Sequence, residues 1–259
     1  DNSGNLAFAV YGYMNRGEHE GEVGVGIYYF DVERNLIQEK AFIPSKKSYA
    51  IAADELGKMV YYNHAEEQLY VLADGTLYQV DLKKNKQTTL AENLKEGQYA
   101  VSSDGHLMAY ESEGNKKGGT EIQVMNLSSL HTYIVEAAEG EQISPLGFVN
   151  GDFIYGKMKS EDAGKKASGE SITPMYELEI RNSKNKKVAS YSFVDKGIYI
   201  SDILIDDNMV TLNRVEKSGD IYNVTSQEFI TNNEERKDTA IKTEVYTTAL
   251  MEKQMRITF

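Results

Sequence analysis

The chain has 259 residues, a net charge of −12, 41% apolar residues and no cysteine. The apolar fraction allows a packed core. The acidic excess argues against nucleic-acid binding, which requires clustered lysine and arginine, and against docking on an anionic membrane surface. Without cysteine there is no disulfide, thiolate nucleophile or iron–sulfur site. No stretch reaches the roughly 18–20 apolar residues of a membrane-spanning helix, so we expect no direct membrane insertion in this segment.

Short apolar runs follow one another along the chain, separated by glycine, asparagine, aspartate and lysine, and helical periodicity is nearly absent. Runs of this length between turn residues are typical of β-strands in an all-β domain. In chain order, the sequence predicts strands at Leu6–Tyr13, Val25–Val32, Leu36–Ile43, Lys58–Tyr62, Gln68–Leu72, Thr76–Leu82, Leu107–Tyr110, Glu121–Asn126, Thr132–Val135, Phe153–Lys157, Met175–Ile180, Val188–Phe193, Tyr199–Ile205, Met209–Val215 and Ile221–Phe229.

A turn followed by an apolar strand recurs at five places, 46 to 57 residues apart. Each turn is expected to need a positive φ, which glycine adopts freely and asparagine tolerates. The five turns are marked by Gly4, Gly57, Gly105, Gly151 and Asn208.

Each repeat holds about four strands, which is the pattern of a β-propeller blade. Leu6–Tyr11 is apolar on both alternating faces, as expected of a blade strand covered by a neighbour on each side. The sequence therefore predicts a single all-β domain over residues 1–259. We expect a β-propeller of about five four-stranded blades, or part of a propeller with roughly six to eight.

Two features depart from a regular repeat. Gln68–Leu72 and Thr76–Leu82 suggest an extra hairpin, and the chain begins at what should be the second strand of a blade. Because Gln254–Phe259 is a candidate strand, we expect the tail to supply the missing first strand beside Leu6–Tyr13. The competing hypothesis is a longer propeller, of which this chain is a piece.

The segment Ser102–Tyr110 resembles the repeat of TolB-like and related bacterial propellers, in which an Asp-Gly turn precedes an apolar strand. The other four turns match this repeat in pattern rather than in identity, and the proline that usually precedes the Asp-Gly is missing. The resemblance implies the fold and no particular activity, because such propellers serve as binding platforms, assembly subunits and enzyme domains.

No catalytic motif is present, and none of the four histidines pairs at metal-ligand spacing. The loop over residues 15–26 holds the candidate binding residues Glu18, His19, Glu20 and Glu22. Carboxylates beside an imidazole can hold a divalent cation, although a solvated hairpin tip has the same composition. We therefore predict no catalytic residues, no metal ligands and no cofactor.

These observations lead us to expect a non-catalytic, monomeric binding module that recognises a protein or a glycan. Because the chain starts at Asp1 without methionine, we expect it to be excised from a longer extracytoplasmic or cell-surface protein, whose signal or membrane anchor lies outside the segment. The alternative is the propeller domain of an enzyme, of a glycosidase type or associated with a peptidase. Converging carboxylates about 5–10 Å apart in a central pocket would favour this alternative. A purely structural spacer is the third hypothesis.

Overall fold

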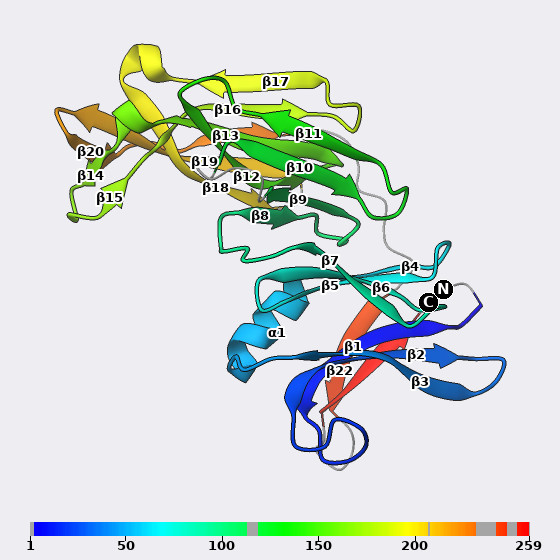
Figure 1. The fold of residues 1–259 in the computed structure, drawn as a ribbon. Coiled ribbons are helices and arrows are strands. Elements are labelled where there is room, and N and C mark those ends of the chain that lie inside the picture. Colours follow the sequence, from blue (N-terminus) through cyan, green and yellow to red (C-terminus); the bar gives the residue numbers. More distant parts are fainter. Residues whose placement is uncertain (1–2, 113–118, 207, 232–241, 248–252, 259) are drawn as a thin grey trace.

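The computed structural model describes residues 3–112, 119–206, 208–231, 242–247 and 253–258. It is an all-β fold in which sheets follow one another from the N-terminus onwards (Figure 1). Within the described residues there is one α-helix, α1 (Tyr49–Lys58), and there are two short 3-10 turns, Ser160–Asp162 and Val194–Lys196.

The first three sheets are antiparallel meanders in which strand order follows chain order. The first has three strands and the next two have four strands each, which is the blade pattern that the sequence predicts. Their strands are β1 (Leu6–Tyr13), β2 (Val23–Asp31), β3 (Leu36–Pro44), β4 (Val60–Asn63), β5 (Gln68–Ala73), β6 (Thr76–Asp81), β7 (Lys86–Ala91), β8 (Tyr99–Val101), β9 (Leu107–Glu111), β10 (Glu121–Asn126) and β11 (Thr132–Glu136).

The fourth sheet has ten strands and contains two meanders, β12-β13-β16-β17 and β18-β19-β20. A single pair of residues, Met175 on β16 and Ile200 on β18, joins the two meanders. The hairpin β14–β15 is inserted into the first meander and pairs in parallel with β20. The strands are β12 (Glu141–Val149), β13 (Asp152–Lys159), β14 (Gly164–Lys166), β15 (Ser171–Ile172), β16 (Met175–Arg181), β17 (Lys187–Ser192), β18 (Ile198–Asp206), β19 (Met209–Ser218), β20 (Ile221–Val224) and β21 (Glu228–Thr231).

Successive sheets stack face to face, and the core lies between them. On β5, Leu69 and Val71 pack toward the first sheet, whereas the alternate residues Tyr70 and Leu72 pack toward the third. Alternate residues of a strand point to opposite faces, so this strand must be apolar on both. The stacked meanders define an all-β protein of propeller type, as predicted, while the number of blades in the complete ring stays a prediction.

Helix α1 corrects one of the predicted turns. Gly57 lies inside this helix and not in a positive-φ turn, whereas Gly4, Gly105 and Gly151 do have positive φ. The segment Ala50–Leu56 contains three alanines and a leucine, which are strong helix formers. The helix is held by Glu55, whose carboxylate accepts hydrogen bonds from the backbone N–H groups of the β5–β6 turn at 2.6 and 3.2 Å.

In the first four sheets, the strands that the sequence analysis misses are β7, β8, β12 and the short hairpin strands β14 and β15. β7 is polar at the sheet edge, β8 has only three residues, and β12 carries a bulge between Pro145 and Gly147. The hairpin β5–β6, expected to be an extra element, forms the two central strands of a regular four-stranded sheet. The single strand predicted at Ile221–Phe229 is divided into β20 and β21.

The predicted tail strand is present as β23 (Lys253–Thr258), but its partner differs from the prediction. It pairs with β22 (Lys242–Thr247) in a separate two-stranded sheet, and the first sheet has the order β1-β2-β3. Among the described residues, the tail therefore pairs with β22 and not with β1. Within the described residues, no helix is long and apolar enough to cross a membrane.

Candidate functional site

The predicted binding loop over residues 15–26 connects β1 and β2 and is closed by backbone hydrogen bonds between Met14 and both Gly21 and Glu22. His19 stacks on Phe42, with 4.1 Å between the ring centroids. Its Nε2 lies 3.4 Å from Glu39 Oε1, and its Nδ1 lies 3.8 Å from Glu22 Oε2. His19 therefore packs on the sheet. One of its neighbours is Glu39, which the sequence analysis did not select.

The other two candidate residues of this loop, Glu18 and Glu20, are exposed. In the part of the chain that the structure describes, there is no group of three or more histidine, aspartate or glutamate side chains placed to hold a metal ion. The structure thus brings together His19 and Glu22 only, and the binding role of all four residues stays a prediction.

A cavity of about 960 Å³ opens where the inner strands of the third and fourth sheets approach one another. Its walls are formed by β8, by the bulged part of β12, by β18 and by the turns that follow them. The lining residues are Gly57, Lys58, Glu96, Gly97, Tyr99, Ala100, Val101, Ser102, Ser103, Asp104, His106, Leu107, Leu146, Gly147, Phe148, Asn150, Gly151, Ile203, Leu204, Ile205 and Asn208. We refer to it as the central cavity.

The strand β8 presents a free backbone edge to the central cavity. It is the last strand of its sheet and, among the described strands, pairs only with β9. Bonds from Ser102 N to Leu107 O and from Glu111 N to Gln98 O fix the hydrogen-bonding phase of the pair. Because bonded and non-bonded residues alternate in an antiparallel pair, the N–H and C=O groups of Tyr99 and Val101 point away from β9 and toward the cavity.

The carboxylates that line the central cavity are Glu96 and Asp104. Asp104 accepts hydrogen bonds from Ser102 Oγ at 2.7 Å and approaches His106 Nδ1 at 2.5 Å. Burial raises the pKa of Asp104, but the hydrogen bonds from Ser102 and His106 outweigh this effect and hold the pKa below its usual value. Asp104 is therefore ionised and already paired, which does not suit a general acid.

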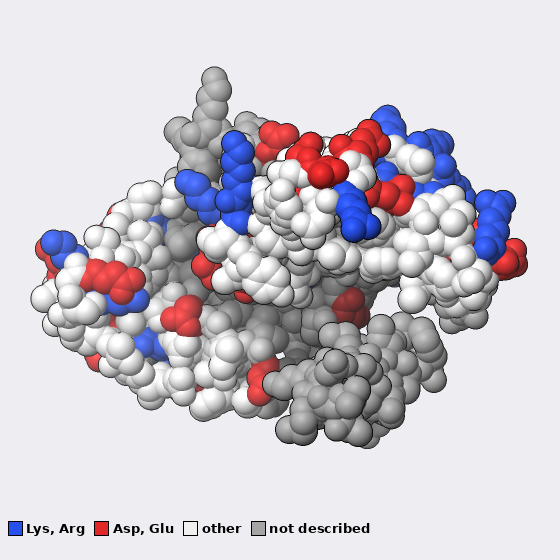
Figure 2. All heavy atoms as spheres, turned by 90° about the horizontal axis from the view of Figure 1, so that it is seen from below, with Lys and Arg blue, Asp and Glu red and all other residues white. Residues whose placement is uncertain are grey.

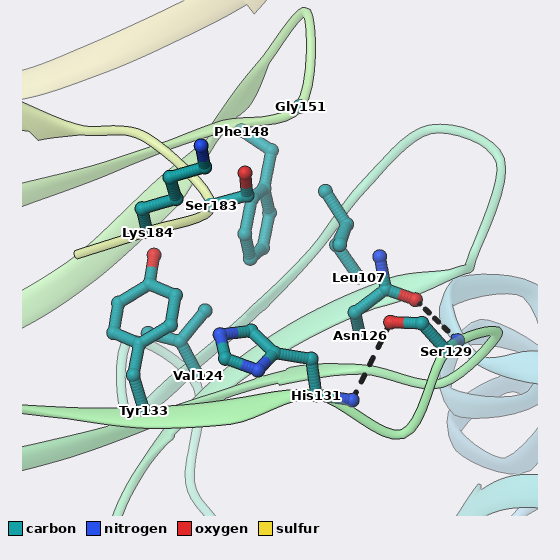
Figure 3. Close-up of a pocket in the computed structure, with 10 residues that line it drawn as sticks. All are labelled: Leu107, Val124, Asn126, Ser129, His131, Tyr133, Phe148, Gly151, Ser183 and Lys184. Atoms are coloured by element: carbon teal, nitrogen blue, oxygen red, sulfur yellow. Dashed lines mark hydrogen bonds between the residues drawn. The ribbon is translucent and has the colours of Figure 1, made fainter. Parts of the chain in front are cut away.

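A second, smaller pocket of about 320 Å³ lies between the third sheet and the β12–β17 meander (Figure 3). Its floor is formed by the buried side chains of Leu107, Val124 and Phe148. The polar part of its wall comes from the ends of β10 and β11 with the turn between them, and from the turn that joins β16 to β17. The residues involved are Asn126, Ser129, His131, Tyr133, Ser183 and Lys184. We refer to it as the side pocket.

A cluster of charged side chains lies close to the side pocket, on the face of β13 and β16 that is turned toward the third sheet. Glu179 is 1% exposed and lies 2.7 Å from both Lys157 Nζ and Arg181 Nη2. Burial raises the pKa of Glu179. Hydrogen bonds from Lys157 and Tyr155 and the charges of Lys157 and Arg181 outweigh burial and lower this pKa from 4.5 to about 2. Glu177 lies 3.5 Å from Lys157 Nζ, so two carboxylates balance these two cations and the cluster serves the packing of the sheets.

Charged residues elsewhere do not form a single acidic surface on the face shown in Figure 2. Lysine and arginine side chains are interspersed with aspartate and glutamate, and broad uncharged areas lie between them. Acidic and basic side chains are thus mixed on this face. This distribution keeps a protein soluble and does not by itself define a binding site.

Comparisons with known proteins concern the architecture. No protein-family model matches the chain, and a search of curated proteins gives no match. The β-propeller domain of the Trilobed protease from Pyrococcus furiosus, which has an open velcro topology, is similar over 98% of this chain and 91% of that domain, with 10% identity and a TM-score of 0.39. The tricorn protease is similar over 82% of this chain, with 10% identity and a TM-score of 0.40.

This chain covers 23% of the tricorn protease chain. A chain from the Mitotic Checkpoint Complex is also similar, with 10% identity and a TM-score of 0.27, over 80% of this chain and 74% of that one. At this level the resemblance is one of fold only. The blade architecture rests on the strand order and packing of the chain itself.

Proposed function

We propose that this protein is a non-catalytic binding propeller, which binds an extended peptide segment of a partner protein in the central cavity. The supporting observation is the free edge of β8, where the backbone groups of Tyr99 and Val101 face the cavity. An extended peptide can add a strand to such an edge, with main-chain hydrogen bonds for affinity and adjoining apolar walls for specificity.

The lining of the central cavity favours a peptide over a glycan. Leu146, Ile203 and Leu204 provide apolar surface beside the β8 edge, and Leu204 is 62% exposed. Such residues suit the side chains that alternate along an extended peptide. A glycan site instead needs open aromatic faces for sugar rings, and of the two aromatic residues of the lining, Phe148 is buried.

The same cavity gives no support to the glycosidase alternative. Glycoside hydrolysis requires one carboxylic acid that keeps its proton and a second carboxylate facing it. Asp104 is held ionised by Ser102 and His106, as described above, and Glu96 is exposed on the turn before β8. The expected location outside the cytoplasm stays a prediction.

The substitution Val101→Pro tests this proposal. The Val101 N–H points into the cavity and is not part of the β8–β9 ladder, and proline is tolerated at such positions of edge strands. A library of random decapeptides, displayed with free carboxyl ends, would first provide a binding peptide. We expect Val101→Pro to bind that peptide about tenfold or more weakly than the wild type does, because proline removes a main-chain hydrogen-bond donor and obstructs the edge of β8.

Val101→Ala is the matched control, because it shortens the same side chain and keeps the N–H. We expect it to bind the selected peptide within about threefold of the wild type. Titration calorimetry on all three proteins gives the affinities, and circular dichroism checks that each is folded. If the library yields no peptide, or if Val101→Pro binds as well as Val101→Ala, the proposal is wrong.

A further inference from the structure

We propose that the side pocket receives the C-terminal residue of the bound peptide, with an apolar side chain on its floor and the free carboxylate at its rim. This inference rests on the proposed peptide-binding function and names the part of the peptide that is recognised. It follows from the composition of the floor, the charge of the rim and the position of the side pocket beside the central cavity.

The floor of the side pocket is apolar and of limited size. Leu107, Val124 and Phe148 are at most 8% exposed. The volume of about 320 Å³ is at the lower end of the range for ligand pockets, roughly 300–1,000 Å³. One apolar side chain of the size of leucine, together with its carboxylate, fits a pocket of this size better than a larger ligand does.

The rim provides hydrogen-bond donors and a positive charge. Figure 3 shows His131 beside Tyr133 on one side of the pocket, and the Tyr133 hydroxyl directed toward the turn that carries Ser183 and Lys184. In the described part of the chain, Lys184 makes no ion pair, whereas the nearby Arg181 is bound to Glu179 at 2.7 Å. Ammonium, imidazole and phenol groups are each able to donate a hydrogen bond to a carboxylate.

The protonation of Tyr133 agrees with this role. Burial, and to a smaller extent the charge of Asp152, raise the pKa of Tyr133 to about 12, although Arg181 acts in the opposite direction. The hydroxyl therefore keeps its proton at neutral pH and can donate it to a carboxylate oxygen. Asp152 is the acidic group whose charge acts on this hydroxyl.

The side pocket adjoins the central cavity. Leu107, Phe148 and Gly151 belong to the lining of both. Leu107 also follows directly on the turn that leads from β8 to β9, so the side pocket begins where the free edge of β8 ends. A peptide paired with β8 can therefore place its last residue in the side pocket without crossing a sheet.

The experiment compares the selected peptide as a free acid and as a C-terminal amide. We expect wild-type protein to bind the acid about tenfold more tightly than the amide, because the amide loses a charge-assisted interaction. In Lys184→Gln this ratio should fall to about twofold or less. Lys186→Gln, which removes a neighbouring exposed lysine, is the matched control and should keep the wild-type ratio.

The inference is overturned by equal binding of acid and amide to the wild type, and also by an undiminished ratio in Lys184→Gln. In either case the difference in peptide affinity between Val101→Pro and Val101→Ala can persist. The proposed peptide-binding function would then hold without recognition of the C-terminal residue. N-acetyl-leucine, tested as the free acid, separates a peptide end from a small organic acid. If it binds as tightly as the peptide, the pocket is a small-molecule site and the inference fails.

Discussion

Replacing Glu179 by glutamine is expected to lower the free energy of unfolding by about 3 kcal/mol. The substitution leaves Arg181 without its buried counter-charge and Lys157 with Glu177 alone, at 3.5 Å, while it keeps the size of the side chain. The value is at the lower end of those for buried ion pairs, because both cations are partly exposed, at 18% and 26% of their side chains. Urea unfolding followed by circular dichroism measures the change.

Glu170→Gln is the matched control for Glu179→Gln. Glu170 also pairs with a lysine, Lys166, at 3.0 Å, but its side chain is 65% exposed. An exposed pair of this kind is worth about 1 kcal/mol or less. If both variants lose the same small amount of stability, the cluster at Glu179 does not hold the sheets together as described.

The same carboxylate predicts how stability depends on pH. The pKa of Glu179 is about 2 in the folded protein against an ordinary value of 4.5, so the unfolded chain binds the proton more readily. The stabilisation is present above pH 4.5 and is lost as the pH falls toward 2. By linkage this contributes roughly 3 kcal/mol. The stability difference between wild type and Glu179→Gln should therefore shrink by that amount between pH 6 and pH 2.

Replacing Phe153 by alanine is expected to cost about 3–5 kcal/mol of stability. The side chain is fully buried, and its ring lies 5.4 Å from that of Phe148 and 5.7 Å from that of Tyr155. It belongs to the core that joins the third sheet to the β12–β17 meander. Its loss removes apolar contacts and leaves a cavity where two sheets stack.

Phe229→Ala is the matched control, because this phenylalanine is 55% exposed on β21. We expect a loss of about 0.5 kcal/mol or less from this exposed position. Both variants are compared by urea unfolding. Equal losses in the two variants would contradict the description of a core that lies between successive sheets.

The sequence predicts most strands because stacked sheets need apolar residues on both faces of their inner strands. Gln68–Ala73 shows this pattern clearly, and the structure has a strand there. The polar outer strand Lys86–Ala91 and the three-residue strand Tyr99–Val101 lack such a signal. The helix Tyr49–Lys58 has an alanine-rich segment that indicates helix, but apolar runs on either side obscure it.

The candidate site is much harder to predict than the strands. Tyr99, Leu146 and Leu204 line one cavity although they are far apart in the sequence, and only the stacking of the sheets brings them together. The edge of β8 is free because no described strand pairs with it on that side. A local sequence pattern does not predict which strand edges stay unpaired. His131 and Lys184 are equally hard to predict as site residues. Each lies in an ordinary polar turn, and the side pocket arises where the two turns meet.

The most direct test of the proposed function is amide hydrogen exchange at β8, measured by NMR with and without the selected peptide. If the peptide pairs with the free edge, the N–H groups of Tyr99 and Val101 become bonded, and their exchange should slow by about tenfold or more. Ala100, whose N–H already bonds to β9, should change much less. Unchanged exchange at Tyr99 and Val101 in the peptide complex would contradict peptide binding by the edge of β8.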